Sequence, residues 1–473
     1  MKSISRKRTF CNRQRQTETK FSSYNIATES YFVTDKIEEM KKEVISVEGK
    51  AVKFGGTSLC DAKQIQKASE IVRADPKRKV IVVSAPGKRT EKDEKITDLL
   101  IKADTARSET EREALFAVIE NRFDEMIHAL HLPLDFSMEY KTMRRLHGDA
   151  LISRGEYFSA RIFSVLLGIT FLDAADCIFF RADGTLDETK TRTILSEKLT
   201  RAEKAVIPGF YGSMPGGDIR LFSRGGSDIT GAIAADAMDA DIYENFTDVS
   251  GFLLAEPKIV PNAMTVPIVS YRELRYLSAM GASVLHADAI LPLRKKQIPV
   301  VIRNTNAPHG PHTWVVSRKE KGIGGIVGAV GYTMVALARS HIGDDPDAVA
   351  KILSILAAYG FAPTLLSHEP DSLNVLIRYC DYEKADKIAI AIQQKVDAEI
   401  VTVRGNIAEI AVAGEGFAAE MRAAVWKALE KANVRPCFAA SVTESFSLVI
   451  GVSEAELSSA IRHIYEALVP FLQ

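Results

Sequence analysis

The segment Ala51-Val-Lys-Phe-Gly-Gly-Thr-Ser58 changes character halfway along its length. A short apolar run that contains Lys53 is followed by Gly55 and Gly56, and then by two hydroxyl-bearing residues. The apolar run predicts a buried strand, and the glycines predict a tight turn whose backbone N–H groups can approach an anion closely. A lysine, a glycine turn and a following helix N-terminus together predict a phosphate site. A plain glycine turn beside a solvent-seeking lysine would share the pattern.

The residues after this turn predict a helix over 62–73, with Asp61 as its N-cap. The turn is not a P-loop, because its lysine precedes the glycines and no Gly-x-x-x-x-Gly-Lys-[Ser/Thr] pattern occurs.

Length and charge limit the possible classes of protein. At about 150 residues per domain, 473 residues predict two or three domains. With 61 basic and 61 acidic residues, the net charge is zero, which gives no general attraction to nucleic acid or to an anionic membrane. No apolar run reaches the roughly 18–20 residues that span a bilayer. Five widely spaced cysteines with no Cys-x-x-Cys pair favour a reducing cytoplasm over structural zinc or a disulfide framework.

Residues 1–47 differ from the rest of the chain. The first 20 residues contain seven Lys or Arg and a single acid, Glu18, and they lack apolar periodicity. This composition is typical of an organellar transit peptide or of a disordered tail. It also fits a start site assigned too far upstream, with Met40 as the true start. We expect a tail without a role in the chemistry.

From residue 51 onward, apolar runs alternate with amphipathic ones. The β-branched run at 79–84 predicts a strand buried on both faces. Further strands are expected at 205–208, 241–243 and 298–303, and helices at 97–103, 110–130 and 151–167. The segment 222–228 is expected to open another helix, which runs to about 240. This alternation predicts an α/β fold with a largely parallel sheet.

A second glycine turn, Arg224-Gly-Gly-Ser-Asp228, repeats the logic of the first. A cation, a glycine pair and a hydroxyl again precede a helix. Asp228 could simply cap that helix. Arginine at such a turn favours bidentate recognition of a carboxylate, and two anion-binding turns in one domain favour a functional site.

After the Pro- and Gly-rich segment 308–312, the chain contains two similar units, each predicted as strand–helix–strand–strand–helix. The first unit covers 334–339, 346–359, 362–367, 372–378 and 382–396. The second covers 408–413, 418–433, 435–441, 445–451 and 454–468. A plain α+β dimerisation domain would give the same pattern.

Several motifs occur together in one order, and their combination resembles that of the aspartate kinases. The motifs are Lys53-Phe-Gly-Gly-Thr-Ser, Ser84-Ala, Ser153-Arg-Gly-Glu156, Gly209-Phe-Tyr-Gly-Ser213, Arg224-Gly-Gly-Ser-Asp228 and Thr247-Asp248-Val-x-Gly251. The resemblance implies the amino-acid-kinase fold, a mainly parallel open sheet, over residues 48–306. For residues 320–473 it implies two ferredoxin-like α+β modules of the ACT type, at about 330–400 and 401–473, which bind an amino-acid effector.

The resemblance also implies an activity, the transfer of the γ-phosphoryl group of ATP, with Mg²⁺, to the side-chain carboxylate of L-aspartate. This is the first step toward lysine, threonine and methionine. By position, the implied catalytic residues are Lys53 and Asp228. The implied aspartate-binding residues are Ser58, Ser84, Thr97, Glu156, Phe210, Arg224 and Ser227. The implied ATP-binding residues are Lys53, Gly55, Gly56, Thr247, Asp248 and Lys258. The implied effector-binding residues are Ser340, Asp344 and Asp345, and no protein ligand to a metal is expected.

Three positions depart from the common family pattern, and two of them concern the ATP phosphates. Ser283 stands where many members have a lysine near the nucleotide phosphates, and Lys258 stands in place of an arginine. Lys258 is therefore the expected cation for the ATP phosphates. A glutamate-type amino-acid kinase and a non-catalytic amino-acid sensor are the alternative interpretations. We further expect a cytoplasmic homodimer, or a larger homo-oligomer, with lysine or threonine as the effector.

Overall fold

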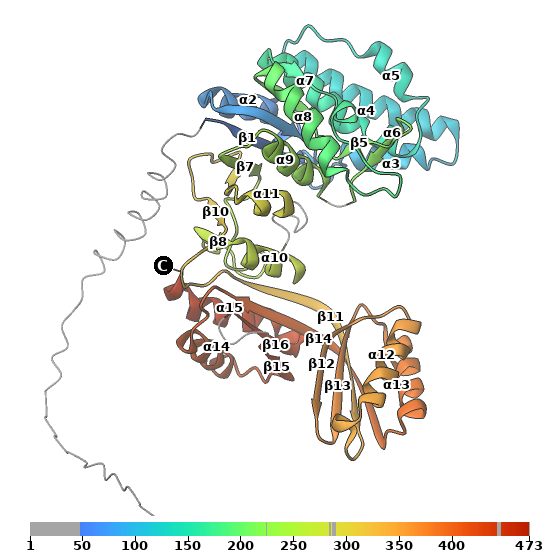
Figure 1. Cartoon of the computed structure of the whole chain (residues 1–473), viewed down its shortest axis with the longest axis vertical. Helices are drawn as coiled ribbons and strands as arrows, with labels where there is room; N and C mark the ends of the chain where they lie inside the picture. The colour runs from blue at the N-terminus through green and yellow to red at the C-terminus, as the bar shows by residue number, and fades with distance from the viewer. Residues whose placement is uncertain (1–47, 224, 283–284, 286–289, 442–445, 473) are drawn as a thin grey trace, which may run out of the picture. The chain divides into compact units, whose positions relative to one another are not determined.

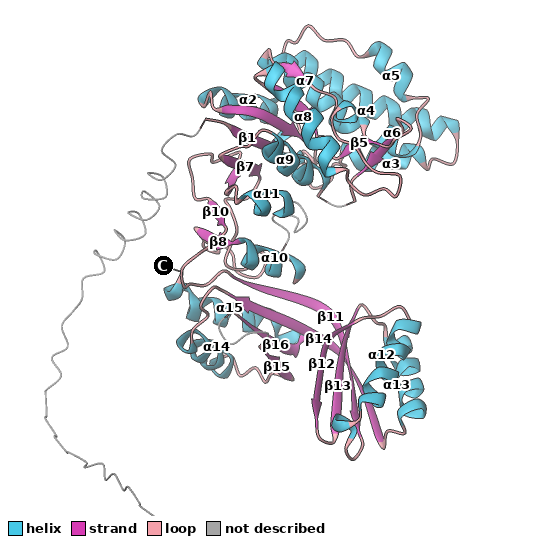
Figure 2. Ribbon diagram, viewed as in Figure 1, coloured by secondary structure: helices cyan, strands magenta, loops and turns pink. Residues whose placement is uncertain are grey.

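The computed structural model describes residues 48–472, except for residues 224, 283–284, 286–289 and 442–445. The expectations for residues 1–47 lie outside this part of the chain. Figure 1 shows the order of the elements along the chain, and Figure 2 shows their secondary structure.

The larger sheet has eight strands in the order β3-β4-β2-β1-β7-β9-β10-β8. Six of them, from β3 to β9 in this order, pair in parallel, whereas β10 runs antiparallel to β9. The strands are β1 (Lys50–Phe54), β2 (Arg78–Val83), β3 (Thr170–Phe171), β4 (Ala205–Pro208), β7 (Ile242–Thr247), β8 (Ile268–Ser270), β9 (Val300–Asn304) and β10 (Thr313–Val316). The predicted parallel α/β sheet is confirmed.

Helices cover both faces of this sheet, and the alternation of side chains along β2 shows it. Ile81 and Val83 pack into the core formed with α2 (Ala62–Ala74), α3 (Ile96–Asp104), α4 (Glu109–Ala129) and α7 (Arg154–Leu167). Val80 and Val82 pack into the opposite core, with α8 (Glu188–Ala202) and α9 (Gly226–Ala237). Successive side chains of a strand point to opposite faces, so an uninterrupted apolar strand needs two helical layers.

Two expectations from the sequence were wrong in detail. The single helix expected at 151–167 is two helices, α6 (Gly148–Ile152) and α7. Between them, the Ser153 hydroxyl donates to the carbonyl of Ala150 and accepts from Arg154, and such local bonds compete with helix continuity. The kinase fold was expected to end at Asn306, before the Pro- and Gly-rich segment at 308–312. That segment instead joins β9 to antiparallel β10, so the large sheet continues past Asn306.

The remaining helices and turns of this part complete its outline. They are η1 (Gly56–Leu59), α5 (Ser137–Met143), η2 (Ala174–Asp176), the hairpin β5 (Tyr211–Ser213) and β6 (Ile219–Leu221), α10 (Tyr271–Ala279) and α11 (Ile290–Lys296).

The C-terminal region forms one six-stranded antiparallel sheet in the order β12-β13-β11-β14-β16-β15. Its strands are β11 (Gly325–Ala338), β12 (Pro363–Glu369), β13 (Ser372–Arg378), β14 (Ile400–Ala413), β15 (Phe438–Ala440) and β16 (Ser447–Ser453). Its helices are η4 (Ile342–Asp344), α12 (Pro346–Ala358), α13 (Tyr382–Val396), α14 (Ala419–Lys431), η5 (Glu454–Glu456), α15 (Leu457–Leu468) and η6 (Val469–Phe471). The repeated order of elements is confirmed, and both units share this single sheet.

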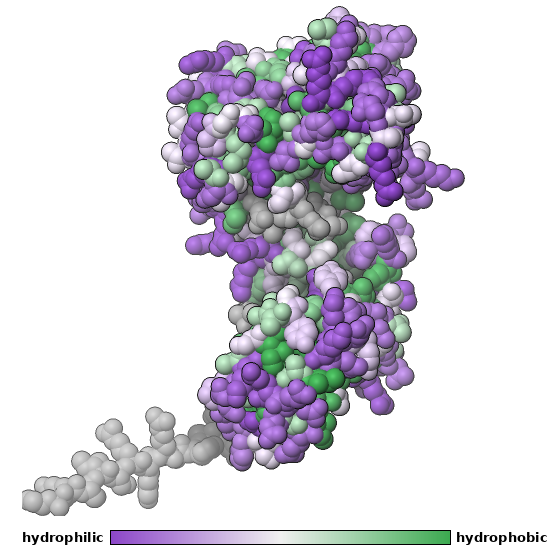
Figure 3. Space-filling view, turned by 90° about the vertical axis from the view of Figure 1, so that its right-hand side faces the viewer, coloured by the Kyte–Doolittle hydropathy of each residue, from purple (hydrophilic) through white to green (hydrophobic). Residues whose placement is uncertain are grey.

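Hydrophilic side chains predominate on the face drawn in Figure 3, with apolar ones scattered among them. Within the described ranges, no helix combines the length and the apolar character needed to cross a membrane.

Candidate active site

The predicted site residues gather where the parallel strands end. Lys53 is the penultimate residue of β1, and Asp228 lies in the first turn of α9, which packs across β1 and β2. The Nζ atom of Lys53 is 2.6 Å from Oδ1 of Asp228. The sequence places these residues 175 positions apart, and the parallel sheet brings them into direct contact at its carboxyl edge.

Asn245 completes this pair and was not predicted. Its Nδ2 donates to Oδ1 of Asp228 at 3.0 Å, and its Oδ1 is 3.5 Å from Nζ of Lys53. Lys53 is 8% exposed and Asn245 is 2% exposed. The amide therefore fixes the carboxylate that orients the ammonium group, in surroundings where a charge acts over a longer range than it does in water.

The first glycine turn packs directly against a neighbouring loop. A Cβ atom at Gly56 would lie 2.9 Å from the carbonyl oxygen of Ala85, so only glycine fits there. The N–H of Gly87 donates to the carbonyl of Gly56 at 2.8 Å, and the N–H of Gly55 donates to the backbone carbonyl of Phe246 at 3.0 Å. These bonds hold the turn between the ends of β2 and β7.

Ser58 is buried at the end of this turn, and its hydroxyl lies 2.7 Å from the hydroxyl of Thr305, just after β9. Thr305 in turn donates its N–H to the carbonyl of Thr247 at 2.9 Å. Thr305 was also missed, because a threonine after a strand carries no signal of its own.

The second glycine turn opens α9 as predicted. Gly225 is the N-cap residue of α9, with φ of 65°, a conformation that favours glycine. Phe210 also has a positive φ, 78°, and its N–H donates to Thr230 Oγ1 at 3.1 Å. Ser227 lies beside Gly209, where a Cβ atom would be 2.6 Å from the serine hydroxyl. Arg224 lies outside the described residues.

Glu156 is the most unusual group of the site. It lies in the first turn of α7 and is 4% exposed, and its Oε2 has no hydrogen-bond partner within the described chain. Burial raises the pKa of this carboxyl to about 8, although the backbone N–H of Ala85 donates to it. A buried carboxyl with an unused oxygen suits a cationic group of a ligand.

Ser84 and Thr97 flank the loop that carries Ala85. The N–H of Ser84 donates to the carbonyl of Phe54 at 3.1 Å, beside Lys53. Thr97 is half-buried in the first turn of α3, where that loop ends.

The residues expected to bind the nucleotide are less closely grouped. Thr247 ends β7, and its hydroxyl donates to the exposed carboxylate of Asp248 at 3.1 Å. Lys258 is exposed, and no hydrogen bond or ion pair within the described ranges ties it to this cluster. Ser283 is one of the residues that the structure does not describe.

The three expected effector residues lie far along the chain, at the start of α12. Asp345 is the N-cap of α12, and its Oδ1 accepts from the N–H groups of Asp347 and Ala348 at 3.1 and 3.2 Å. Its second oxygen contacts Arg339, which holds the pKa of Asp345 below its usual value. Ser340 and Asp344 are exposed. The carboxylate of Asp345 is thus engaged within the chain.

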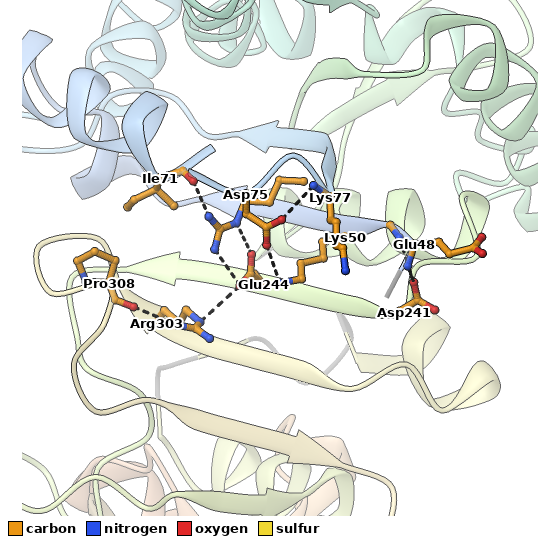
Figure 4. A network of polar contacts seen from close by, with 11 residues as sticks. Glu48, Lys50, Ile71, Asp75, Lys77, Asp241, Glu244, Arg303 and Pro308 are labelled. Atoms are coloured by element: carbon orange, nitrogen blue, oxygen red, sulfur yellow. Dashed lines mark hydrogen bonds and ion pairs between the residues drawn. The ribbon is translucent and has the colours of Figure 1, made fainter. Parts of the chain in front are cut away.

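A second buried ion cluster lies on the opposite face of β7. Glu244 is 1% exposed, and the Nε and Nη2 atoms of Arg78 donate hydrogen bonds to its carboxylate at 2.6 and 3.1 Å. In Figure 4, Arg303 approaches the same carboxylate, with its Nε 3.5 Å away, and donates to the carbonyl of Pro308. Because successive side chains of a strand point to opposite faces of the sheet, Asn245 points toward Lys53 and Asp228, and Glu244 points toward this cluster. The cluster extends along this face from Arg78, at the amino end of β2, to Arg303, the penultimate residue of β9.

The family model described as "Amino acid kinase family" matches residues 50–304 of the chain. Aspartokinase 3 of Bacillus subtilis is 31% identical over 455 residues, which cover 88% of this chain and 98% of that protein. The chain belongs to the aspartokinase family. Among solved structures, aspartate kinase of Clostridium acetobutylicum is 36% identical, with a TM-score of 0.80. That match covers 89% of this chain and all of that one. Aspartokinase III of Escherichia coli, in complex with aspartate and ADP, has a TM-score of 0.70 at 21% identity and supports the fold alone.

Proposed function

We propose that this chain is an aspartate kinase, which transfers the γ-phosphoryl group of ATP to the side-chain carboxylate of L-aspartate. The observation that carries the proposal is the Lys53–Asp228 ion pair between two glycine turns at the carboxyl edge of a parallel sheet. Membership of the aspartokinase family supports the choice of aspartate over another amino acid.

The chemistry requires charge neutralisation more than proton transfer. The acceptor carboxylate is ionised at neutral pH, so no general base is needed. Two anions must meet while a phosphoryl group passes between them, and a fixed cation stabilises the charge at that point. Lys53 supplies this cation, and Asp228 and Asn245 hold it in place before substrate arrives.

The two ends of aspartate call for opposite charges. Glu156 would bind the α-ammonium group through the oxygen that has no partner within the described chain. Arg224 would bind a carboxylate through its planar fork of N–H donors. Ser58, Ser84, Thr97, Phe210 and Ser227 would complete the pocket.

ATP would lie toward the end of β7, with Gly55 and Gly56 near its phosphates and Thr247 and Asp248 on the nucleotide side. Lys258 would supply the cation that Ser283 cannot. No group of three or more His, Cys, Asp or Glu side chains suited to a metal ion occurs within the described ranges. We propose that Mg²⁺ enters with ATP and is held mainly by phosphate oxygens and water.

The C-terminal sheet would act as a pair of ACT modules that respond to lysine or threonine near Ser340 and Asp344. We further propose a homodimer or larger homo-oligomer, in the cytoplasm, whose catalytic domain runs from about residue 48 to the end of β10 at Val316. The sensor alternative, a family member without catalysis, would keep the effector response and lack turnover.

One assay tests the activity directly. The purified chain is incubated with ATP, Mg²⁺ and aspartate, and hydroxylamine traps the acyl phosphate as a hydroxamate. We expect a hydroxamate with aspartate and little with glutamate. Formation with glutamate alone would favour a glutamate-type kinase. Absence of product with either amino acid, in a folded chain that still binds lysine or threonine, would favour the sensor.

A further inference from the structure

Arg122 is a buried arginine outside every motif named above. It lies on α4 and is 3% exposed. Its guanidinium group donates to three backbone carbonyl groups. The Nη1 atom reaches Glu94 at 2.7 Å, and Nη2 reaches Cys60 at 3.2 Å and also Gly87. Asp93 balances its charge, with Oδ2 3.4 Å from Nη2.

These carbonyl groups belong to two loops that together form one side of the candidate site. Cys60 directly follows the first glycine turn and η1. Gly87 and Glu94 lie in the connection between β2 and α3. Arg122 is therefore bonded to both loops at once, and one guanidinium group bridges their backbones.

Both loops carry groups assigned to aspartate. The first leads to Ser58, and the second begins with Ser84 and carries Ala85, whose N–H donates to Glu156. The loops are in backbone contact, since a Cβ atom at Gly87 would lie 2.7 Å from the carbonyl carbon of Gly56. A small shift of either loop would thus move several aspartate contacts together.

We propose that Arg122 is a positioning residue that sets the spacing of these two loops and so determines the affinity for aspartate. This inference rests on the proposed function. Arg122 touches no reacting atom and acts through the backbones of Cys60 and Gly87. Among the residues assigned to ATP, Thr247, Asp248 and Lys258 lie on other elements, whereas Gly55 and Gly56 belong to the first loop. More of the aspartate residues than of the ATP residues depend on these loops, so we expect a larger effect on aspartate than on ATP.

Lysine can replace Arg122 only in part. The guanidinium group places Nη1 on the carbonyl of Glu94 and Nη2 on those of Cys60 and Gly87, whereas lysine has one nitrogen for both positions. Arg122→Lys keeps the positive charge beside Asp93 and loses at least one of the three carbonyl contacts. Arg122→Ala removes the charge and all three contacts and leaves a space that a free guanidinium ion can enter.

Arg78 offers a matched control. It is also buried, at 9% exposure, pairs with a carboxylate and donates to a backbone carbonyl, that of Ile71. It lies at the amino end of β2, and its hydrogen bonds go to Glu244 and Ile71, which belong to neither loop. Arg78→Ala therefore reports what the loss of a buried arginine does to general stability.

The experiment measures KM for aspartate, KM for ATP and kcat in the hydroxylamine assay, with the full chain. Misplacement of a bound group by about 1 Å costs up to about a hundredfold. We expect Arg122→Ala to raise KM for aspartate by at least about tenfold and KM for ATP by a clearly smaller factor. Millimolar guanidinium should restore the KM for aspartate. Arg122→Lys should show the same split to a smaller extent. Arg78→Ala should show neither the split nor the recovery.

Each result has a definite meaning. Equal changes in both KM values, or the same split in Arg78→Ala, would overturn the role of Arg122. If Arg122→Ala does not fold, Arg122→Lys decides the question by its ratio of KM values. A wild-type chain that forms no hydroxamate would refute the proposed function itself, whereas an active wild type with unchanged aspartate KM in the Arg122 variants would refute only this inference.

Discussion

The buried carboxyl of Glu156 predicts that aspartate binding expels a proton. With a pKa of about 8, roughly 97% of ligand-free chains carry a protonated Glu156 at pH 6.5 and roughly a quarter do so at pH 8.5. An ammonium group favours the ionised carboxylate, so the proton must leave when aspartate binds. We expect release of about one proton per aspartate at pH 6.5 and about a quarter of a proton at pH 8.5.

Titration calorimetry in two buffers with different ionisation enthalpies measures this release. The control is Glu156→Gln, which has no proton to lose. Any proton change that comes from aspartate itself appears in both proteins and cancels in the comparison. Below pH 8, the affinity of the wild type should fall by about tenfold per pH unit, or about 1.4 kcal/mol. A wild type that shows the same buffer dependence as Glu156→Gln at pH 6.5 would refute the assignment of Glu156 to the ammonium group.

Further predictions follow from other groups of the chain. Lys53→Ala should lower kcat by about 10²–10³-fold, as expected for the loss of a preorganised charge, while KM for aspartate changes little; steady-state kinetics would contradict this if KM carried the effect. Asp344→Ala should weaken inhibition by lysine or threonine at unchanged thermal stability, and intact inhibition would exclude Asp344 from the effector site. Asp345→Ala should instead lower Tm, because it removes the α12 cap and the partner of Arg339. Burial raises the pKa of Glu409 to about 7, so the folded chain holds a proton that the unfolded chain has lost above about pH 4.5. The stability that Glu409 contributes is therefore fully present below about pH 4.5 and is lost as pH rises through 7. In urea unfolding, the free energy of unfolding of Glu409→Gln minus that of the wild type should be larger at pH 8 than at pH 5. The same difference at both pH values would disprove this.

The local chemistry of the site could be predicted from the sequence, because it depends on residues next to one another. The glycine turns, the Asp61 cap and the β-branched run of β2 can each be recognised from a few consecutive residues. The glycine turns near Lys53 and Asp228 were visible in the same way, whereas the catalytic roles of the two residues were implied by the resemblance to the aspartate kinases.

Contacts that depend on register could not be predicted in this way. Asn245 is a single amide in an otherwise ordinary strand, and its importance follows only from its pairing with Lys53 across β1 and β7. Arg122 bonds to backbone carbonyls 28 to 62 positions away, and a carbonyl carries no residue-specific signal. The two-residue strand β3 and the three-residue strand β8 are too short for a pattern to stand out.

The long strands β11 and β14 affect how the regulatory region can be divided. The first part of β11 pairs with Glu409–Ala413 of β14, and Gly328 lies against Ile461 and Leu457 of α15. The later part, from Tyr332, pairs with β13 and belongs to the other unit. The two units thus share strand β11, which begins in the sheet half of the second unit and ends in that of the first. A cut near residue 400 would therefore separate β14 from the strand that completes its core. Exchange of a single regulatory unit between two relatives would leave unpaired edges, and transplantation has to carry everything from Gly325 to the end of α15 as one piece.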